Sequence, residues 1–177
     1  YYQSAAEKKI PVAQYSLGYQ YEHGFGVKRN LIMAAKWYQA SADQGYVAAQ
    51  SNIGYFYLNG LGVKKDYKKS FYYYRLAAEK KNAEAEYSLG VIYSYGLGVE
   101  RNDVLAFEWY QRSANQGYSD AEFKLGMFYS QGLGVKKDLH QAFSWFQKSA
   151  LNGNARAQLS FGKMYLFGYA VPEDAKA

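Results

Sequence analysis

The string Gly-x-Gly-Val recurs in this chain every 36 residues. Its four copies begin at Gly24, Gly60, Gly96 and Gly132, and a degenerate copy, Gly168-Tyr169-Ala170-Val171, follows at the next interval. A fixed period of about 20 to 50 residues is typical of proteins that stack identical structural units on one another. The sequence therefore predicts a repeat array, in which each unit contacts mainly its neighbours.

Each repeat contains the pattern of two helices. Ala13 is followed by Leu17, Gly18 and Tyr21, and this spacing, repeated at the same interval, places small and large apolar residues on one helix face. An aromatic pair and, one turn later, two small residues mark a second helix, as in Trp37-Tyr38 and Ser41-Ala42. We expect these aromatic side chains to interlock with small residues between successive units. The predicted first helices are 11–23, 47–59, 83–95, 119–131 and 155–167, and the predicted second helices are 30–44, 66–81, 102–116 and 138–152.

Residues that favour helix ends recur at the same interval. Strong N-cap residues precede the second helices, at Asn30, Asp66, Asn102 and Asp138. Glycines suited to a left-handed C-terminal position follow them, at Gly45, Gly117 and Gly153. Lys81 breaks the glycine column, so we expect the neighbouring Asn82 to adopt the left-handed conformation there.

Composition excludes several classes of protein. The chain is 49% hydrophobic with two prolines, which argues against disorder, and it has no cysteine, which excludes disulfides and thiol chemistry. No apolar run reaches the roughly 18 residues of a transmembrane helix. The net charge of +6 is dispersed, which suits an acidic partner surface better than nucleic acid. Because the chain starts at Tyr1 and ends within a repeat, we expect it to be a trimmed segment.

The pattern Ala-x-x-x-Leu-Gly-x-x-Tyr-x-x-Gly-x-Gly-Val-x-x-Asn/Asp, followed by the aromatic pair and Ala-Ala, resembles the Sel-one-like repeat family, relatives of the tetratricopeptide repeat. The resemblance implies an all-α, right-handed α/α superhelix of 36-residue antiparallel helix pairs. Residues 1–177 then form a single array, with a partial repeat at 1–9, full repeats at about 10–45, 46–81, 82–117 and 118–153, and a partial or capping repeat at 154–177. Some bacterial members carry a Cys pair in each repeat, and this chain departs from them.

In tetratricopeptide-like arrays the first helices line a concave groove, so the resemblance implies a partner site on these helices. The positions between the packing columns are spaced i, i+4, i+8 and vary in type while the packing columns hold. The alternative is that some of these rings cover helix seams. The predicted groove residues are Tyr15, Tyr19, His23, Tyr55, Asn59, Tyr87, Val91, Tyr95, Phe123 and Met127, and the same stripes include Ser51, Gln131, Leu159, Lys163 and Phe167.

A second candidate surface is basic. Paired cationic residues precede three of the N-caps, with Glu100 interrupting the column in the remaining repeat. An acidic protein or anionic lipid headgroups could bind this edge, and the alternative is a solvated loop flank. The basic residues are Lys28, Arg29, Lys64, Lys65, Lys136 and Lys137.

The sequence contains no convincing catalytic, cofactor or metal site. The Gly-x-Gly string lacks the third glycine and the strand-to-helix context of a dinucleotide fingerprint, so its glycines are expected to supply positive-φ backbone. His23 and His140 lie in different repeats without metal-ligand spacing. We therefore predict a protein that is not an enzyme and uses no cofactor.

The leading functional hypothesis is a bacterial adaptor that binds a protein, such as a secreted effector or an envelope protein, in the Tyr-rich groove. The absence of cysteine leaves the compartment open, with a periplasmic or cell-envelope location somewhat favoured over the cytoplasm. One alternative is an immunity protein that neutralises a type-six-secretion phospholipase effector. Others are a carbohydrate-binding or hydrolytic domain with rings that stack on sugars, and a purely structural spacer.

Overall fold

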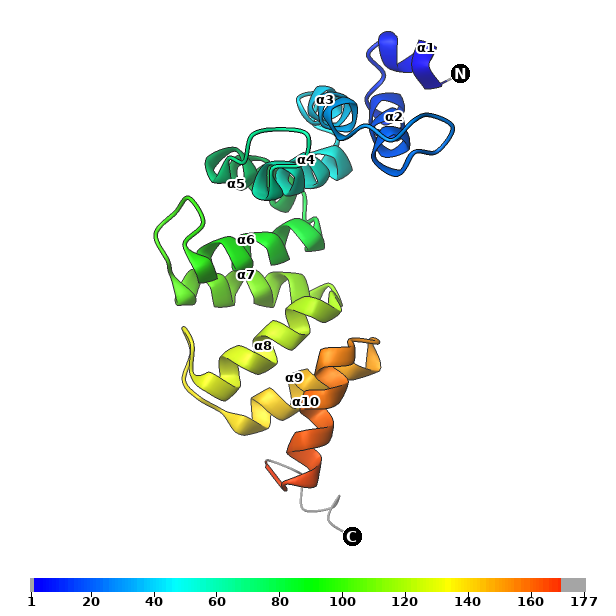
Figure 1. Cartoon of the computed structure of the whole chain (residues 1–177). Helices are drawn as coiled ribbons and strands as arrows, with labels where there is room; N and C mark the ends of the chain where they lie inside the picture. The colour runs from blue at the N-terminus through cyan, green and yellow to red at the C-terminus, as the bar shows by residue number, and fades with distance from the viewer. Residues whose placement is uncertain (1, 170–177) are drawn as a thin grey trace. The chain divides into compact units, whose positions relative to one another are not determined.

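A computed structural model describes residues 2–169 of the chain, with side chains from Ala5 onward, and over this range the protein contains helices and no strands (Figure 1). The all-α prediction is therefore confirmed. Ala170 and Val171 of the degenerate motif lie outside the described residues. The helices are α1 (Tyr2–Glu7), α2 (Pro11–His23), α3 (Leu31–Ala42), α4 (Val47–Asn59), α5 (Tyr67–Glu79), α6 (Ala83–Tyr95), α7 (Asp103–Asn115), α8 (Ser119–Gln131), α9 (Leu139–Leu151) and α10 (Ala155–Leu166).

The helices coincide closely with the predicted ranges. α2, α4, α6 and α8 begin and end where the sequence predicts, and α10 ends one residue early. The second helices begin one residue later than predicted, because the residue at each predicted start is the N-cap. Asn30 Oδ1, for example, accepts hydrogen bonds from the backbone N–H groups of Ile32 and Met33, both at 3.1 Å. Asp66, Asn102 and Asp138 cap α5, α7 and α9 in the same way.

The turn after each second helix requires one left-handed residue. Gly45, Gly117 and Gly153 supply it, with φ of 85°, 82° and 85°, as predicted. The prediction for Asn82 is wrong, because Lys81 itself is left-handed with φ of 59°. The side chain of Asn82 instead accepts a hydrogen bond from the backbone N–H of Ala85 at 2.9 Å, so it caps the start of α6.

Within a repeat, the two helices approach closely at the glycine of the first helix. A Cβ atom on Gly90 would lie 2.5 Å from Cδ1 of Tyr110, and one on Gly18 would lie 2.7 Å from the same atom of Tyr38. We expected the aromatic rings to fit small residues of successive repeats, but the glycine that receives each ring lies in the same repeat. Tyr38 meets the next repeat through an edge-on contact with Phe56, at a centroid distance of 5.3 Å.

This close approach predicts that alanine substitutions at two helical glycines change the stability of the protein differently. Gly90→Ala should destabilise the protein by about 1–3 kcal/mol, because the methyl group overlaps the Tyr110 ring. Gly162→Ala is the control, since its Cβ would meet nothing within 4 Å, and it should stabilise α10 by up to about 1 kcal/mol through helix propensity. Urea unfolding followed by circular dichroism measures both. Equal effects would contradict the close packing at Gly90.

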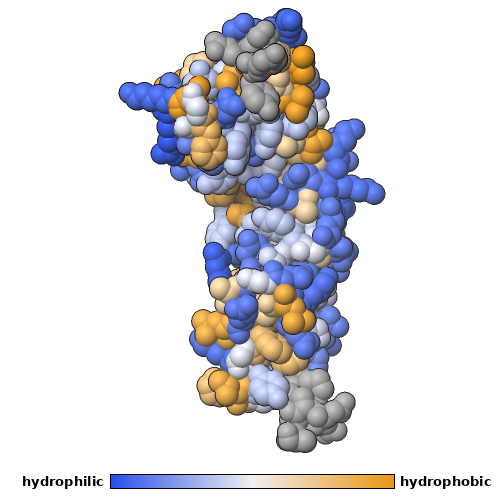
Figure 2. Space-filling view, turned by 90° about the vertical axis from the view of Figure 1, so that its right-hand side faces the viewer, coloured by the Kyte–Doolittle hydropathy of each residue, from blue (hydrophilic) through white to orange (hydrophobic). Residues whose placement is uncertain are grey.

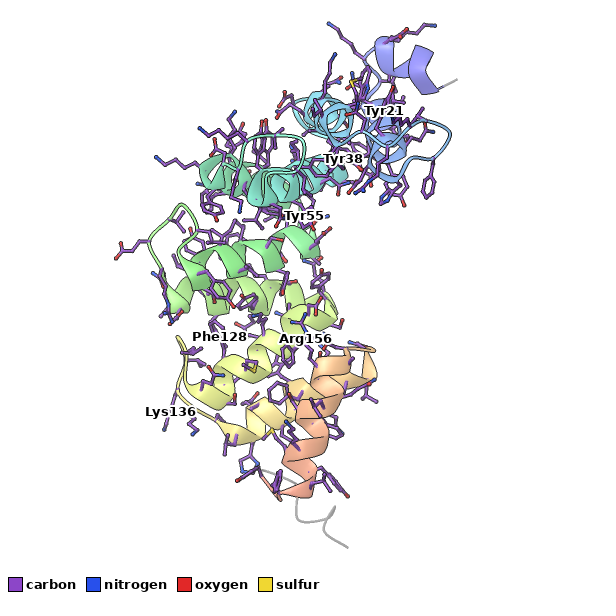
Figure 3. All side chains as sticks on the ribbon, viewed as in Figure 1. Tyr21, Tyr38, Tyr55, Phe128, Lys136 and Arg156 are labelled. Atoms are coloured by element: carbon purple, nitrogen blue, oxygen red, sulfur yellow. The ribbon has the colours of Figure 1, made fainter. Side chains whose placement is uncertain are left out.

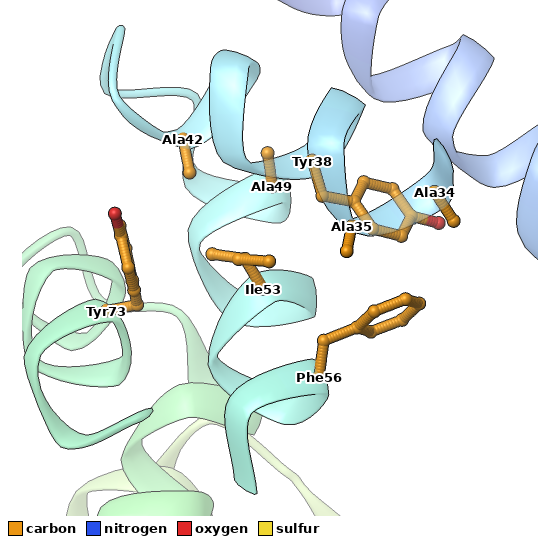
Figure 4. Close-up of a cluster of buried hydrophobic side chains, with 8 residues drawn as sticks. All are labelled: Ala34, Ala35, Tyr38, Ala42, Ala49, Ile53, Phe56 and Tyr73. Atoms are coloured by element: carbon orange, nitrogen blue, oxygen red, sulfur yellow. The ribbon is translucent and has the colours of Figure 1, made fainter. Parts of the chain in front are cut away.

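The described residues group into two compact units, one reaching to residue 85 together with residues 97–99, and one formed by residues 86–96 and those from 100 onward. Each unit has a core of alanines and large aromatic or aliphatic side chains. The first unit's main cluster is Ala34, Ala35, Tyr38, Ala42, Ala49, Ile53, Phe56 and Tyr73 (Figure 4). The second unit's main cluster is Ala106, Tyr110, Ala114, Ala121, Leu125 and Phe128.

A buried polar column also repeats every 36 residues, and the sequence analysis did not identify it. Its members, all at most 6% exposed, are Gln14, Gln50, Glu86 and Glu122. Three of them accept hydrogen bonds from the end of the second helix of their own repeat. The donor–acceptor pairs are Gln44–Gln14 at 2.7 Å, Gln116–Glu86 at 2.6 Å and Asn152–Glu122 at 2.9 Å. In these three repeats the bonds connect the first helix to a residue just after the second helix.

Candidate partner-binding surface

The predicted groove stripes begin with residues that take part in packing. The ring of Tyr15 lies 5.6 Å from that of Tyr38 and 5.2 Å from that of Tyr46, measured between centroids. Tyr87 has the same relation to two tyrosines of the second unit, and Phe123 packs against Phe146 at 5.7 Å. Ser51 is buried as well. The first position of each of these stripes therefore supports the helix seams.

These tyrosine rings are covered by the residue that directly precedes the first helix of the next repeat. Tyr46 covers Tyr15, and Tyr118 covers Tyr87, with ring centroids 5.2 and 5.3 Å apart. Burial raises the pKa of the Tyr15 and Tyr87 hydroxyls. Nearby Tyr46 raises the pKa of Tyr15 further, and Asp120 raises that of Tyr87. Both hydroxyls therefore remain protonated at neutral pH.

Side chains become more exposed toward the C-terminal end of each first helix. Tyr19 and Tyr55 are 43% and 47% exposed, and Tyr95 is 65% exposed. Figure 3 labels Tyr55 on α4. Val91 and Met127 are only partly exposed and pack against the cores of the second unit. The remaining stripe residues are exposed, namely His23, Asn59, Gln131, Leu159, Lys163 and Phe167.

One group of exposed rings stands together in the first unit. The rings of Tyr19 and His23 lie 4.2 Å apart, His23 stacks on Phe25 at 5.5 Å, and Tyr19 and Phe25 are 6.0 Å apart. His23 Nε2 also lies 3.8 Å from Oε2 of Glu22, which accepts a 2.6 Å hydrogen bond from the Tyr38 hydroxyl. These contacts connect the exposed rings to a buried part of the repeat.

Phe25 is the member of this group that the sequence analysis missed. It is 59% exposed and stands at the variable position of Gly-x-Gly-Val, where the other three full copies have leucine. Leu61 and Leu133 pack against the cores of their units. The break from Leu to Phe was the signal in the sequence that could have identified this residue.

The basic residues of the loop edge are all exposed, which fits both a binding surface and a solvated flank. Arg29 Nε donates a 3.0 Å hydrogen bond to the carbonyl oxygen of Glu22, which holds this side chain against the end of α2. Figure 3 shows Lys136 on the loop between α8 and α9. Lys64 and Lys65 differ from the others because they line a cavity beside α5.

Across residues 2–169, no three His, Cys, Asp or Glu side chains converge as metal ligands, and no helix has the length and apolarity to cross a membrane. His140 is exposed on α9, far along the chain from His23. On the face drawn in Figure 2, hydrophobic side chains are interspersed among hydrophilic ones.

Comparisons with known proteins agree on one family. The Sel1 repeat model matches residues 11–46, 47–82, 83–118, 119–154 and 155–177. No curated protein sequence is significantly similar to the chain.

Solved structures include several similar proteins. A protective antigen of uropathogenic Escherichia coli that displays an SLR fold is 39% identical with a TM-score of 0.93, over 98% of this chain and 37% of that one. A Sel1 repeat protein from Oxalobacter formigenes is also 39% identical, with a TM-score of 0.87, over 92% of this chain and 66% of that one. An immunity protein from Pseudomonas aeruginosa is 25% identical with a TM-score of 0.60, over 98% of this chain and 64% of that one.

The chain thus spans less than two thirds of the length of each of these relatives. The five matched repeats nevertheless follow one another without a gap from residue 11 to the end. Their period is that of the helix pairs described above. Together these matches show that the chain belongs to the Sel1 repeat family.

Proposed function

We propose that this chain is a non-enzymatic scaffold that binds a protein partner through the exposed aromatic side chains of its first helices. Proteins with Sel1 repeats generally mediate protein–protein interactions, which supports the class of function. The observation that carries the proposal for this surface is the ring group Tyr19, His23 and Phe25, in which three exposed side chains contact one another. Aromatic residues are enriched at the centres of protein interfaces.

The geometry of this group favours binding for a physical reason. Binding usually costs free energy because mobile side chains become fixed in an interface. Rings that already contact one another have lost part of that freedom before the partner arrives. Exposed apolar rings that gather in one place also mark interaction sites more often than single exposed residues do. Tyr55 on α4 and Tyr95 on α6 are exposed rings at related positions of later repeats.

An immunity function is a second candidate, because the immunity protein of Pseudomonas aeruginosa shares the fold at 25% identity over nearly the whole of this chain. In that role the same aromatic side chains would cover the active site of a secreted effector. Co-expression separates the two functions. Protection of cells from an effector encoded beside the gene supports immunity, whereas binding without protection supports an adaptor.

The central experiment compares two surfaces of the protein. The wild-type protein is used to isolate its partner, and the affinity for that purified partner is then measured by calorimetry. The variant Tyr19→Ala/Phe25→Ala should bind at least about 30-fold more weakly, the loss of about 2 kcal/mol that defines an interface hot spot. Tyr87 is a poor choice for substitution, because it packs against Tyr110 and its loss would disturb the fold.

The control is the variant Ile32→Ala/Val104→Ala, which removes two exposed apolar side chains, 68% and 54% exposed, from second helices. It should bind within about threefold of the wild type. If this control loses affinity while Tyr19→Ala/Phe25→Ala keeps it, the partner binds the second helices and the proposed surface is wrong. Circular dichroism confirms that both variants are folded.

A further inference from the structure

A cavity beside the start of α5, in the first unit, is lined by lysines and tyrosines. It has a volume of about 730 Å³ and is formed by Tyr57, Gly98 and residues 63–69. A second hollow of about 560 Å³ adjoins it and is lined by Gln39, Asp43, Tyr57, Lys68, Lys69, Tyr72 and Tyr73. Because the two hollows share Tyr57, Lys68 and Lys69, they form one continuous surface.

The charge of this surface is specific to its repeat. Residues 64–69 read Lys-Lys-Asp-Tyr-Lys-Lys, whereas the equivalent segments 28–33, 100–105 and 136–141 contain at most two Lys or Arg residues. All four lysines are exposed, and within residues 2–169 none of them forms an ion pair with an acidic side chain. Packing between repeats requires a periodic pattern, so it does not account for this excess of positive charge.

The two carboxylates at this surface are already engaged. Asp66 accepts a 3.0 Å hydrogen bond from the backbone N–H of Lys69 as the N-cap of α5. Asp43 Oδ1 accepts hydrogen bonds from the Tyr73 hydroxyl at 2.9 Å and from Nε2 of Gln39 at 2.8 Å. With four lysines and two carboxylates the surface keeps two net positive charges.

Two stacked tyrosine rings line this surface together with the lysines. The rings of Tyr57 and Tyr73 are nearly parallel, with centroids 6.0 Å apart and planes inclined by 3°, and the Tyr57 hydroxyl donates to Oε1 of Gln39 at 3.0 Å. Burial, together with the Asp43 carboxylate, raises the pKa of Tyr73 to about 12, which keeps its hydroxyl a donor. The other full repeats have tryptophan at this position, which does not carry the hydroxyl that binds Asp43.

The ammonium groups lie near ring faces. Nζ of Lys69 is 5.1 Å from the ring centroid of Tyr57, and Nζ of Lys65 is 5.9 Å from that of Tyr67. Such cation–π contacts orient a lysine without neutralising it. The surface therefore offers positive charges next to aromatic rings, and the exposed ring of Tyr72 can receive a side chain.

From this arrangement we infer that the cavity binds an acidic peptide segment in which carboxylates flank an aromatic residue. The lysines are distributed over two adjoining hollows, which suits several carboxylates along a chain. Asp66 already occupies the amino end of α5, where a single phosphate would otherwise bind. The inference rests on the proposed protein-binding function, but it uses residues other than Tyr19, His23 and Phe25.

The test uses a fluorescein-labelled peptide of six glutamates around one phenylalanine, titrated with the whole chain at about 50 mM salt and followed by anisotropy. The wild type should bind, and Lys68→Glu/Lys69→Glu should weaken binding at least about tenfold, because like charges then face each other. Lys64→Glu/Lys65→Glu should do the same, so the result does not depend on the folding of one variant. Replacing the phenylalanine of the peptide by serine should also lower the affinity.

The matched control is Lys136→Glu/Lys137→Glu, which changes the net charge by the same amount at loop lysines of another repeat. It should bind the peptide within about twofold of the wild type, as should Tyr19→Ala/Phe25→Ala. A loss in the control Lys136→Glu/Lys137→Glu equal to the loss in Lys68→Glu/Lys69→Glu, or no binding by the wild type, would overturn the inference. Direct binding of pyrophosphate or of phosphatidylserine vesicles that is at least as tight as peptide binding, and is lost in the same lysine variants, would also overturn it, in favour of a small anion or a membrane surface.

Discussion

Gly62→Ala is expected to destabilise the protein by about 3–5 kcal/mol, whereas Gly26→Ala should cost only about 1 kcal/mol. Both glycines occupy the third position of Gly-x-Gly-Val, and both are left-handed, with φ of 63° and 71°. A left-handed backbone alone costs an alanine about 1–2 kcal/mol. The Cβ of Gly62 would in addition lie 2.2 Å from the carbonyl oxygen of Leu31, a backbone atom at the start of α3, whereas that of Gly26 would meet nothing within 4 Å.

Because Gly62 and Gly26 are both left-handed, the difference in unfolding free energy between the two variants measures the cost of the contact with Leu31. Urea unfolding followed by circular dichroism gives the free energy of unfolding for each variant. Gly134→Ala supplies an independent copy of the experiment in the second unit, since its Cβ would lie 2.2 Å from the carbonyl oxygen of Asp103. If Gly62→Ala and Gly26→Ala are equally stable, the loop does not depend on this approach.

The loop shows what a repeat pattern conveys and what it omits. The recurrence of Gly-x-Gly-Val predicted a left-handed turn between helices, and the φ angles of Gly24 and Gly26 confirm it. The pattern could not reveal that Gly62 also faces the amino end of the preceding repeat's second helix. A residue that recurs in every repeat shows that each repeat requires it. The recurrence does not show why, because a contact with the neighbouring repeat and a local backbone conformation both recur every 36 residues.

The candidate site was harder to predict than the helices for a related reason. Tyr15 and Tyr19 lie one turn apart on the same stripe, so the sequence pattern predicts the same exposure for both. Tyr15 is covered by Tyr46 at the start of the next first helix, and Tyr19 is not. Exposure therefore depends on how far the following repeat reaches along the helix. The sequence shows that Phe25 and Tyr73 differ from the residues at the same position of the other repeats. It does not show which residues surround them.

The buried column of polar residues leads to the other large expected effect. Glu122 is fully buried, and its carboxylate accepts hydrogen bonds from Nδ2 of Asn152 at 3.1 and 2.9 Å and lies 3.1 Å from Nζ of Lys148. The variant Lys148→Ala/Asn152→Ala should lower the free energy of unfolding by about 3–5 kcal/mol, because it leaves a buried charge without a partner. The ion pair between Arg75 and Glu79 is exposed, so water solvates either charge when the other is removed. Arg75→Ala should therefore cost less than about 1 kcal/mol.

A third substitution distinguishes a stranded charge from the loss of ordinary helix contacts. Adding Glu122→Met to Lys148→Ala/Asn152→Ala removes the unpaired carboxylate and fills the space with an apolar side chain of similar size. This triple variant should recover at least about 2 kcal/mol of the stability that the double variant loses, because replacing a buried charge by a packed hydrophobic group removes the cost of desolvation. If the triple variant is no more stable than the double, Lys148 and Asn152 stabilise α9 through their own packing rather than through Glu122. Denaturant titrations of the three proteins at one pH and salt concentration decide between these outcomes.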